Sequence, residues 1–421
     1  MKIGVIASFF ETRTDIFRMV DHWSKEHEIV LFILPKDKKL LEGIYKEHLA
    51  IRVISERKTG WMNFLSERLF LLAKRIPKSK TNYYLMELFK ASNLPDPQQR
   101  KKALGIVTMQ KRIPRYVSYN WLLKTLRPSR QTCMDDIDLF IGLTEPTDDY
   151  FYARLVQERK QLHMYVYSWD HACKQTRFFS AADYYVWNAG IREDMIELQH
   201  IRPERIKISG SSQFTFIYDY LQKAKPVVKD IPYIYFGCAI GIAGLIEKEV
   251  ELIGKLAAAL STIHPNWRMV VRPYPNLKNW DYYAPLSRLS NVFMDDGFRN
   301  EDGSVKASKI EDKFSAIQNA MAFIHTGSTL GLEACYFDTP VLVADLYPDT
   351  EGDLSIYHFV HQYQNDKYFN HPYPDNMIRS VEQFKHILSN LQDPIYKKPN
   401  REIPQQFPLM SIESFSETLL H

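Results

Sequence analysis

The chain has 421 residues, of which 45% are hydrophobic and 25% are charged, and its formal net charge is +4. Such a chain is too long for one compact core and suits two soluble globular domains of ordinary size. The four cysteines are scattered without a CxxC pair, which favours buried free thiols in a reducing compartment over disulfides or a zinc site.

The N-terminal stretch is apolar from Met1 to Ser8 but turns polar at Glu11, before it reaches the length of a signal peptide's apolar region. Elsewhere no apolar run approaches the ~18 to 20 residues that cross a bilayer. We therefore expect a cytoplasmic protein, which can also associate peripherally with the inner face of the cytoplasmic membrane.

The segment from Arg57 to Arg130 is strongly basic, with 17 Lys and Arg residues against three acidic ones. Aromatic and aliphatic residues lie between these charges at helical spacing: Trp61, Phe64, Leu65, Leu69, Phe70, Leu71, Leu72, Tyr83, Tyr84, Leu85, Leu88 and Phe89. This pattern is typical of a helix on an anionic membrane surface, or of a site for the phosphates of a lipid-linked acceptor. A solvated basic face over a helical core is the alternative. No recognised nucleic-acid motif accompanies the charge, so we expect no nucleic-acid partner.

Residues 1–222 alternate between apolar strand runs and amphipathic helices, which predicts a doubly wound parallel α/β domain. Residues from about 57 to 130 interrupt this series and read as a helical insertion. The expected strands are Lys2–Ser8, Glu28–Leu34, Leu139–Leu143, His163–Tyr167, Tyr184–Trp187 and Arg205–Ser209.

A polar stretch from Tyr218 to Asp230, which contains Pro226, is the expected linker to a second α/β series over residues 231–421. Its expected strands are Tyr233–Phe236, Arg268–Val271, Val292–Met294, Ala322–Ile324 and Val341–Val343. The sequence therefore predicts an α/β protein with two Rossmann-like domains that face each other across a crevice.

The segment from His325 to Glu333 is the richest in candidate binding residues. A strand ends at Ile324 and a helix begins near Ser328, so free backbone N–H groups at Gly327, Ser328 and Thr329 can bind phosphate. Glu333 lies one turn further, where a carboxylate can accept hydrogen bonds from both hydroxyls of a ribose. The alternative is an ordinary helix start with a solvated glutamate.

This segment resembles the Gly-Ser-Ser/Thr…Glu-Ala element of GT-B glycosyltransferases, an element shared by nucleotide-sugar 2-epimerases and by glycerophosphotransferases of teichoic acid synthesis. The resemblance implies that Ser328 and Thr329 contact the phosphates of a nucleotide-sugar and Glu333 its ribose. Arg272-Pro273 is similar to a His/Arg-Pro pair in the same families, which implies that Arg272 pairs with the pyrophosphate. His325, at the leaving phosphate or sugar, and Gly237, at the end of an earlier strand, complete the expected donor site. The alternative for His325 is a histidine packed at a strand end, which is the commoner arrangement.

A second resemblance covers Tyr167-Ser-Trp-Asp-His-Ala-Cys-Lys-Gln-Thr-Arg177, which is similar to the Ser-Trp-Asp-Asn…Lys pattern of bacterial surface-polysaccharide transferases. This chain departs from that pattern at His171, Ser212 and Thr215, which replace Asn, Pro and Asp. With the first resemblance it covers roughly residues 163–345. It implies a glycosyltransferase whose acceptor is a glycan of capsule or lipopolysaccharide type, lipid-linked in our expectation.

An inverting transferase needs a base for the acceptor hydroxyl, and the candidates are Asp170, His171 and Glu145, all just past strand ends. Glu11 and Asp15 follow the first strand and are further candidates. Each can instead be a loop residue that caps a helix or pairs with a basic side chain. A retaining enzyme needs no base here.

No DxD-type metal motif is present, and we expect neither a metal nor any cofactor beside the nucleotide-sugar substrate. Three other functions remain open: a CDP-alditol phosphotransferase of teichoic-acid type, a nucleotide-sugar 2-epimerase, and a degenerate domain that only binds. A soluble epimerase has no evident use for the basic insertion, which favours the transferase.

Overall fold

In the computed structural model the chain forms two compact units. The first unit comprises Met1–Thr215 and Met410–His421, and the second comprises Phe216–Leu409. The described residues are 1–8, 10, 13–39, 41, 49–74, 87, 91–92, 94, 96–112, 117–174, 177–223, 231–241, 243–274, 277–298, 306, 309–346 and 366–421. Glu11, Pro226 and the aromatic residues expected at positions 83, 84 and 89 lie outside them.

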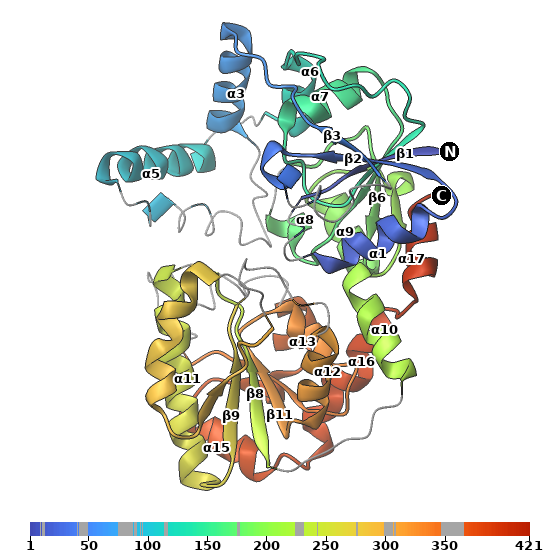
Figure 1. Ribbon diagram of the computed structural model, residues 1–421. Coiled ribbons are helices and arrows are strands. Elements are labelled where there is room, and N and C mark those ends of the chain that lie inside the picture. The colour runs from blue at the N-terminus through green and yellow to red at the C-terminus, as the bar shows by residue number, and fades with distance from the viewer. Residues whose placement is uncertain are drawn as a thin grey trace. The chain divides into compact units, whose positions relative to one another are not determined.

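The first unit is built on a seven-stranded sheet in the order β3-β2-β1-β4-β5-β6-β7, in which every pair of neighbours is parallel (Figure 1). The strands are β1 (Lys2–Ile6), β2 (Glu28–Ile33), β3 (Ala50–Val53), β4 (Leu139–Gly142), β5 (Leu162–Tyr165), β6 (Asp183–Val186) and β7 (Ile206–Ile208). Helices beside them include α1 (Thr14–Trp23), α7 (Asp149–Gln157), α8 (His171–Lys174) and α9 (Ala189–Glu197). The strand order reverses between β1 and β4, which is where ligands bind in open parallel sheets.

The second unit contains a six-stranded parallel sheet in the order β10-β9-β8-β11-β12-β13. The strands are β8 (Tyr233–Gly237), β9 (Arg268–Arg272), β10 (Val292–Met294), β11 (Ala322–His325), β12 (Val341–Ala344) and β13 (Met377–Ile378). The helices include α10 (Thr215–Gln222), α11 (Ala243–Ile263), α12 (Ile310–Asn319), α13 (Thr329–Ala334), α15 (Val381–Ser389) and α16 (Lys398–Gln406). The predicted pair of Rossmann-like domains is confirmed, while the crevice stays a prediction.

The C-terminal helix α17 (Ile412–Thr418) packs on the first unit beside α1 (Figure 1). Trp23 of α1 donates from its indole Nε1 to the carbonyl oxygen of Ser416 at 3.1 Å, and the rings of Tyr165 and Phe415 lie 5.1 Å apart. The division therefore differs from the expected boundary, which placed every residue up to His421 in the second domain.

The described part of the insertion is helical, as expected, and its helices stack outward from the first sheet (Figure 1). They are α3 (Trp61–Ala73), α5 (Pro97–Arg112) and α6 (Tyr119–Thr125). Helix α6 packs on α7, α3 packs on α6, and α5 packs on α3.

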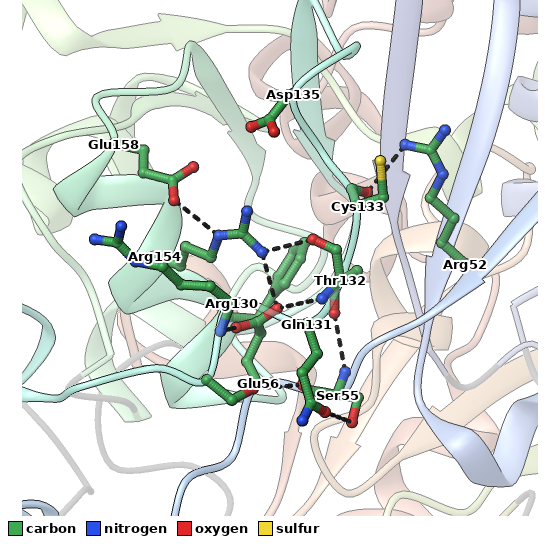
Figure 2. A network of polar contacts seen from close by, with 12 residues as sticks. Arg52, Ser55, Glu56, Arg130, Gln131, Thr132, Cys133, Asp135, Arg154 and Glu158 are labelled. Atoms are coloured by element: carbon green, nitrogen blue, oxygen red, sulfur yellow. Dashed lines mark hydrogen bonds and ion pairs between the residues drawn. The ribbon is translucent and has the colours of Figure 1, made fainter.

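A buried glutamate, Glu56, joins the two ends of the insertion (Figure 2). Its carboxylate accepts hydrogen bonds from the backbone N–H groups of Arg130 at 2.6 Å and Thr132 at 2.8 Å. Nη1 of Arg154 donates to the same carboxylate at 3.1 Å. The chain therefore enters and leaves the insertion at one fixed point.

We expect Glu56→Ala to lower the free energy of unfolding of the first unit by about 3 to 5 kcal/mol, because it leaves the Arg154 charge and two amides without this partner. Urea unfolding measures the change. Glu158→Ala is the matched control, since Glu158 also pairs with Arg154, at 2.8 Å, but is partly exposed. We expect that control to cost less than about 1 kcal/mol. Equal losses in the two variants would contradict the special role of Glu56.

Candidate functional site

In the second unit the strand order reverses between β8 and β11, so the loops that follow these two strands flank the expected ligand position. All strands of the sheet are parallel, and their carboxyl ends therefore lie along one edge. The predicted residues Gly237, Arg272 and His325 end β8, β9 and β11 at that edge.

His325 is fully buried, and it braces the loop that follows its strand. Its Nδ1 accepts hydrogen bonds from the backbone N–H groups of Gly327 at 3.0 Å and Ser328 at 3.2 Å. These bonds assign the ring proton to Nε2. We expected these N–H groups to be free for phosphate, and His325 either to contact the donor or to be packed at the strand end. The structure shows the packed arrangement, with the imidazole turned inward and both N–H groups used within the loop.

Three glycines allow close packing at this edge of the sheet, around His325 and between β8 and β11. Gly327 has a positive φ of 116°, a conformation that side chains other than glycine rarely adopt. A Cβ atom at Gly331 would lie 2.4 Å from Nε2 of His325, so α13 needs a glycine there. A Cβ atom at Gly237 would lie 2.7 Å from the Phe323 ring, which gives this predicted donor-site residue a packing role between β8 and β11.

Glu249, which was not among the predicted site residues, connects the two loops at the reversal point. This residue of α11 is fully buried, and its Oε1 accepts hydrogen bonds from the Thr326 hydroxyl at 2.6 Å and the Ala239 N–H at 3.0 Å. The Tyr283 hydroxyl donates to its Oε2 at 3.3 Å. Burial raises the pKa of Glu249 above its usual value. The loops after β8 and β11 therefore share one buried acceptor.

Arg272 is buried at the end of β9 and already has a carboxylate partner. Its Nη1 lies 2.6 Å from Oδ2 of Asp295, and its guanidinium lies 3.8 Å from the centre of the Phe298 ring. The expected contact of Arg272 with a pyrophosphate stays a prediction. Its fixed, stacked guanidinium suits a planar contact with phosphate oxygens.

Glu333 is held by a lysine that sequence reasoning missed. Nζ of Lys313, on α12, lies 2.5 Å from Oε2 of Glu333, on α13, and both side chains are largely buried. Burial lowers the pKa of Lys313; the charge of Glu333 opposes this shift, and the nearby charge of Arg272 adds to it. Two cations therefore share one small region with Glu333. We call Arg272, Asp295, Lys313 and Glu333 the Arg272–Glu333 cluster.

Ser328 and Thr329 lie at the start of α13, next to this cluster in the chain. The Oγ atom of Ser328 is buried and has no hydrogen-bond partner among the described residues. Ser328 precedes the helix as its N-cap residue, without a side-chain capping bond. The expected contacts of these two hydroxyls with phosphate stay predictions.

In the first unit the structure brings together two of the three expected catalytic residues. His171 opens α8, and its Nε2 lies 3.2 Å from Oε1 of Glu145, in the loop after β4. The Tyr167 ring lies edge-on to the imidazole at 4.3 Å. Asp170 precedes His171 in the chain, and its Oδ1 accepts a hydrogen bond from the Ser168 hydroxyl at 2.7 Å. His171 with Glu145 is thus the better candidate for a base.

Asp15, the further candidate after β1, is locked in a buried ion pair. Arg13 donates to both of its carboxylate oxygens, at 2.8 and 2.6 Å, and the Ser212 hydroxyl donates at 2.6 Å. Burial alone would raise the pKa of Asp15, but the charge and hydrogen bonds of Arg13 outweigh it and lower the pKa. Asp15 is therefore a structural carboxylate, and Ser212, where related patterns have proline, is one of its partners.

The buried state of His325 predicts a pH dependence of stability. Burial lowers its pKa from 6.5 to about 3, so the native state excludes a proton that the unfolded chain binds. Its stabilising contribution is complete above pH 6.5 and is lost as the pH falls towards 3, with a slope of about 1.4 kcal/mol per pH unit. We expect His325→Asn, measured by urea unfolding at several pH values, to show a shallower decline than the wild type. An unchanged pH dependence in His325→Asn would contradict the lowered pKa of His325. His386→Asn, at an exposed position of α15, is the control and should decline with pH like the wild type.

Two hollows in the described surface lie away from the candidate sites. One of about 330 Å³ in the first unit is lined by Leu162, Asp183 and Arg205, near the amino ends of β5, β6 and β7. Another of about 450 Å³ in the second unit is lined by Tyr336, Asp338 and Lys397. Neither contains a predicted site residue, so the site rests on side-chain chemistry at the carboxyl edges.

Within the described ranges, no group of three or more His, Cys, Asp or Glu side chains could hold a metal ion. Independence from metal stays a prediction, which activity in excess chelator checks. No described helix is long and apolar enough to cross a membrane. All four cysteines are free, as expected, but Cys133 is exposed rather than buried.

Comparisons with known proteins agree on the fold. No family model and no curated protein sequence matches the chain. Among solved structures, a putative UDP-N-acetylglucosamine 2-epimerase from Listeria monocytogenes has a TM-score of 0.52 at 11% identity, over 100% of this chain and 94% of that one. Two further structures have TM-scores of 0.51 at 10% identity over 100% of this chain. They are the UDP-GlcNAc 2-epimerase from Neisseria meningitidis bound to UDP-GlcNAc, matched over 98% of its chain, and the S. aureus MnaA-UDP co-structure, matched over 95% of its chain. The chain has the GT-B-type fold, as predicted.

Proposed function

We propose that the protein is a glycosyltransferase that moves a sugar from a nucleotide-sugar donor to a glycan acceptor, which we expect to be lipid-linked. The observation that carries this proposal is the Arg272–Glu333 cluster, at the edge of the sheet where open parallel sheets bind ligands. Arg272 and Lys313 are both largely buried; burial lowers the pKa of Lys313 and the charge of Arg272 lowers it further, so an added anion near both side chains would stabilise the two cations. A diphosphate supplies that anion.

Glu333 contributes the second element of donor recognition. An ionised carboxylate only accepts hydrogen bonds, and its two oxygens match the adjacent hydroxyls of a ribose. Lys313 holds one of these oxygens, so the carboxylate is oriented before a ligand arrives. The fixed orientation lowers the entropy that binding must remove.

His171 is the proposed base for transfer, with Glu145 orienting its imidazole. In this step the acceptor hydroxyl loses its proton to His171 while its oxygen bonds to the anomeric carbon. The bond from that carbon to the diphosphate oxygen breaks, and the nucleoside diphosphate leaves with the electron pair. Arg272 and Lys313 stabilise the charge that develops on the leaving group.

A second candidate is a nucleotide-sugar 2-epimerase, since the similar solved structures named above include UDP-GlcNAc 2-epimerases that match over the whole chain. An epimerase needs no acceptor. Incubation of nucleotide-sugars alone separates the two functions: we expect no 2-epimer to form, and its formation would favour the epimerase. Transfer of an alditol phosphate from a CDP donor would show instead as release of CMP.

Thermal shift with UDP, GDP, CDP, CMP and dTDP tests donor binding. A ligand at 100 times its dissociation constant stabilises the native state by about 2.7 kcal/mol, so one nucleoside diphosphate should raise the melting temperature clearly above the others. No stabilisation by any of the five would contradict a nucleotide site.

A further inference from the structure

Helix α3 of the insertion has one buried side and one apolar side that faces solvent. Its buried residues are Asn63, Ser66 and Phe70. Its exposed large side chains are Trp61 at 73%, Phe64 at 59%, and Leu65, Leu69 and Leu71 at 40 to 41% exposure. At the helical repeat of 3.6 residues per turn, these five lie around the side opposite Phe70. Such an exposed apolar face on one helix marks an interaction surface.

The charges of α3 and of α5, the helix that packs on it, are mainly positive. The acidic residue of α3, Glu67, accepts a hydrogen bond from the Tyr150 hydroxyl at 2.8 Å, so it is engaged with the body of the unit. Arg68 is exposed, and its guanidinium lies 5.1 Å from the centre of the Phe64 ring. The neighbouring helix α5 exposes three consecutive cations, Arg100, Lys101 and Lys102.

We propose that this face docks on the surface of an anionic lipid bilayer. We call the exposed side of α3 together with the exposed cations of the adjoining helix α5 the α3–α5 surface, made of Trp61, Phe64, Leu65, Arg68, Leu69, Leu71, Arg100, Lys101 and Lys102. Its apolar side chains enter the boundary between headgroups and acyl chains, and its cations contact anionic headgroups. The proposal does not rest on the proposed function, because none of these residues belongs to either candidate site.

Charge and composition favour a lipid surface over other occupants. A second copy of the chain would bring two strongly basic segments together, which costs electrostatic energy. A nucleic acid would satisfy the cations but offers no apolar partner for three exposed leucines. An anionic bilayer satisfies both kinds of side chain at once.

The insertion is tied to the first unit, so docking would hold that unit at the membrane. Nδ2 of Asn63 donates to the carbonyl oxygens of Lys58 at 2.8 Å and Arg127 at 3.0 Å. Glu56 fastens the ends of the insertion to Arg154 of α7. The α3–α5 surface is therefore presented on a braced helix.

Sedimentation with vesicles of phosphatidylcholine, with and without phosphatidylglycerol, tests the proposal on the full chain. We expect binding to the anionic vesicles only, weakened by added salt. Arg100→Gln/Lys101→Gln/Lys102→Gln should lower the partition coefficient roughly 100-fold, because each cation near an anionic surface contributes about a factor of five. Trp61→Ser/Phe64→Ser should lower it at least about tenfold.

Matched changes in the second unit serve as controls. Lys255→Gln/Lys385→Gln/Lys398→Gln removes three partly exposed lysines, and Phe293→Ser removes an exposed aromatic ring. These controls should bind vesicles like the wild type, and all variants should keep its melting temperature because the changed side chains are exposed. Absence of binding to anionic vesicles, or equal loss in the controls, would overturn the proposal. The proposal would also be overturned if Trp61 and Phe64 were required for dimer formation or for binding of nucleic acid and not for binding of vesicles.

Discussion

His171→Gln lowers the rate of sugar transfer roughly 100- to 10,000-fold in our expectation, while the affinity for the nucleotide stays at the wild-type value. Glutamine keeps a polar side chain of similar size but cannot take the proton of the acceptor hydroxyl near neutral pH. The nucleotide affinity is unaffected because the Arg272–Glu333 cluster belongs to the second unit. Steady-state rates and isothermal titration measure the two quantities separately.

Two neighbouring residues provide the comparison. Glu145→Gln should reduce the rate less than His171→Gln does, because Glu145 acts through the imidazole, 3.2 Å away. Asp170→Asn should stay within a few-fold of the wild type, since its carboxylate is hydrogen-bonded to Ser168. A variant of His171 that keeps its rate, with Asp170→Asn inactive, would transfer the role of base to Asp170.

Glu333→Gln weakens nucleotide binding about 100-fold in our expectation. The carboxylate gives up charged hydrogen bonds to two ribose hydroxyls, and such bonds contribute about 1.5 to 3 kcal/mol each before partial compensation by the amide. Isothermal titration with the best-binding nucleotide measures the loss. Glu382→Gln, an exposed residue of α15, is the matched control and should bind normally.

The loss of Glu333 also leaves Lys313 buried without its partner, which alone lowers stability. The double variant Lys313→Met/Glu333→Gln separates the two effects. It should recover most of the melting temperature that Glu333→Gln loses but none of the nucleotide affinity. Recovery of affinity along with stability would show that Glu333 is structural and touches no ligand.

Eleven of the thirteen described strands were predictable, because parallel strands buried on both faces read as continuous apolar runs, as at Leu139–Gly142. The edge strands β3 and β13 were missed, because β3 is partly exposed and β13 has only two residues. The position of α17 was not predictable from the sequence, because its place beside α1 depends on contacts between residues far apart in the chain, such as Trp23 and Ser416. Local pattern identifies a helix but not the unit on which it packs.

The candidate site was only partly predictable for a similar reason. The positions of Arg272 and Glu333 followed from strand ends and a resemblance, but Lys313 reaches Glu333 from another helix. Glu249 stands between Glu247 and Glu251, both exposed, and helical phase with Ile246 and Ile253 was the one signal that could have singled it out. His325 was expected just past its strand but is the last residue of β11, and whether its ring faces solvent or the interior depends on the Gly331 contact across the turn.

The most direct test of donor recognition by Glu333 compares a ribonucleotide with its 2′,3′-dideoxy counterpart, in the wild type and in Glu333→Gln. We expect the wild type to bind the ribonucleotide about 100-fold more tightly, and the variant to bind both with nearly equal affinity. The same preference for the ribonucleotide in both proteins would contradict the assignment of Glu333 to the ribose.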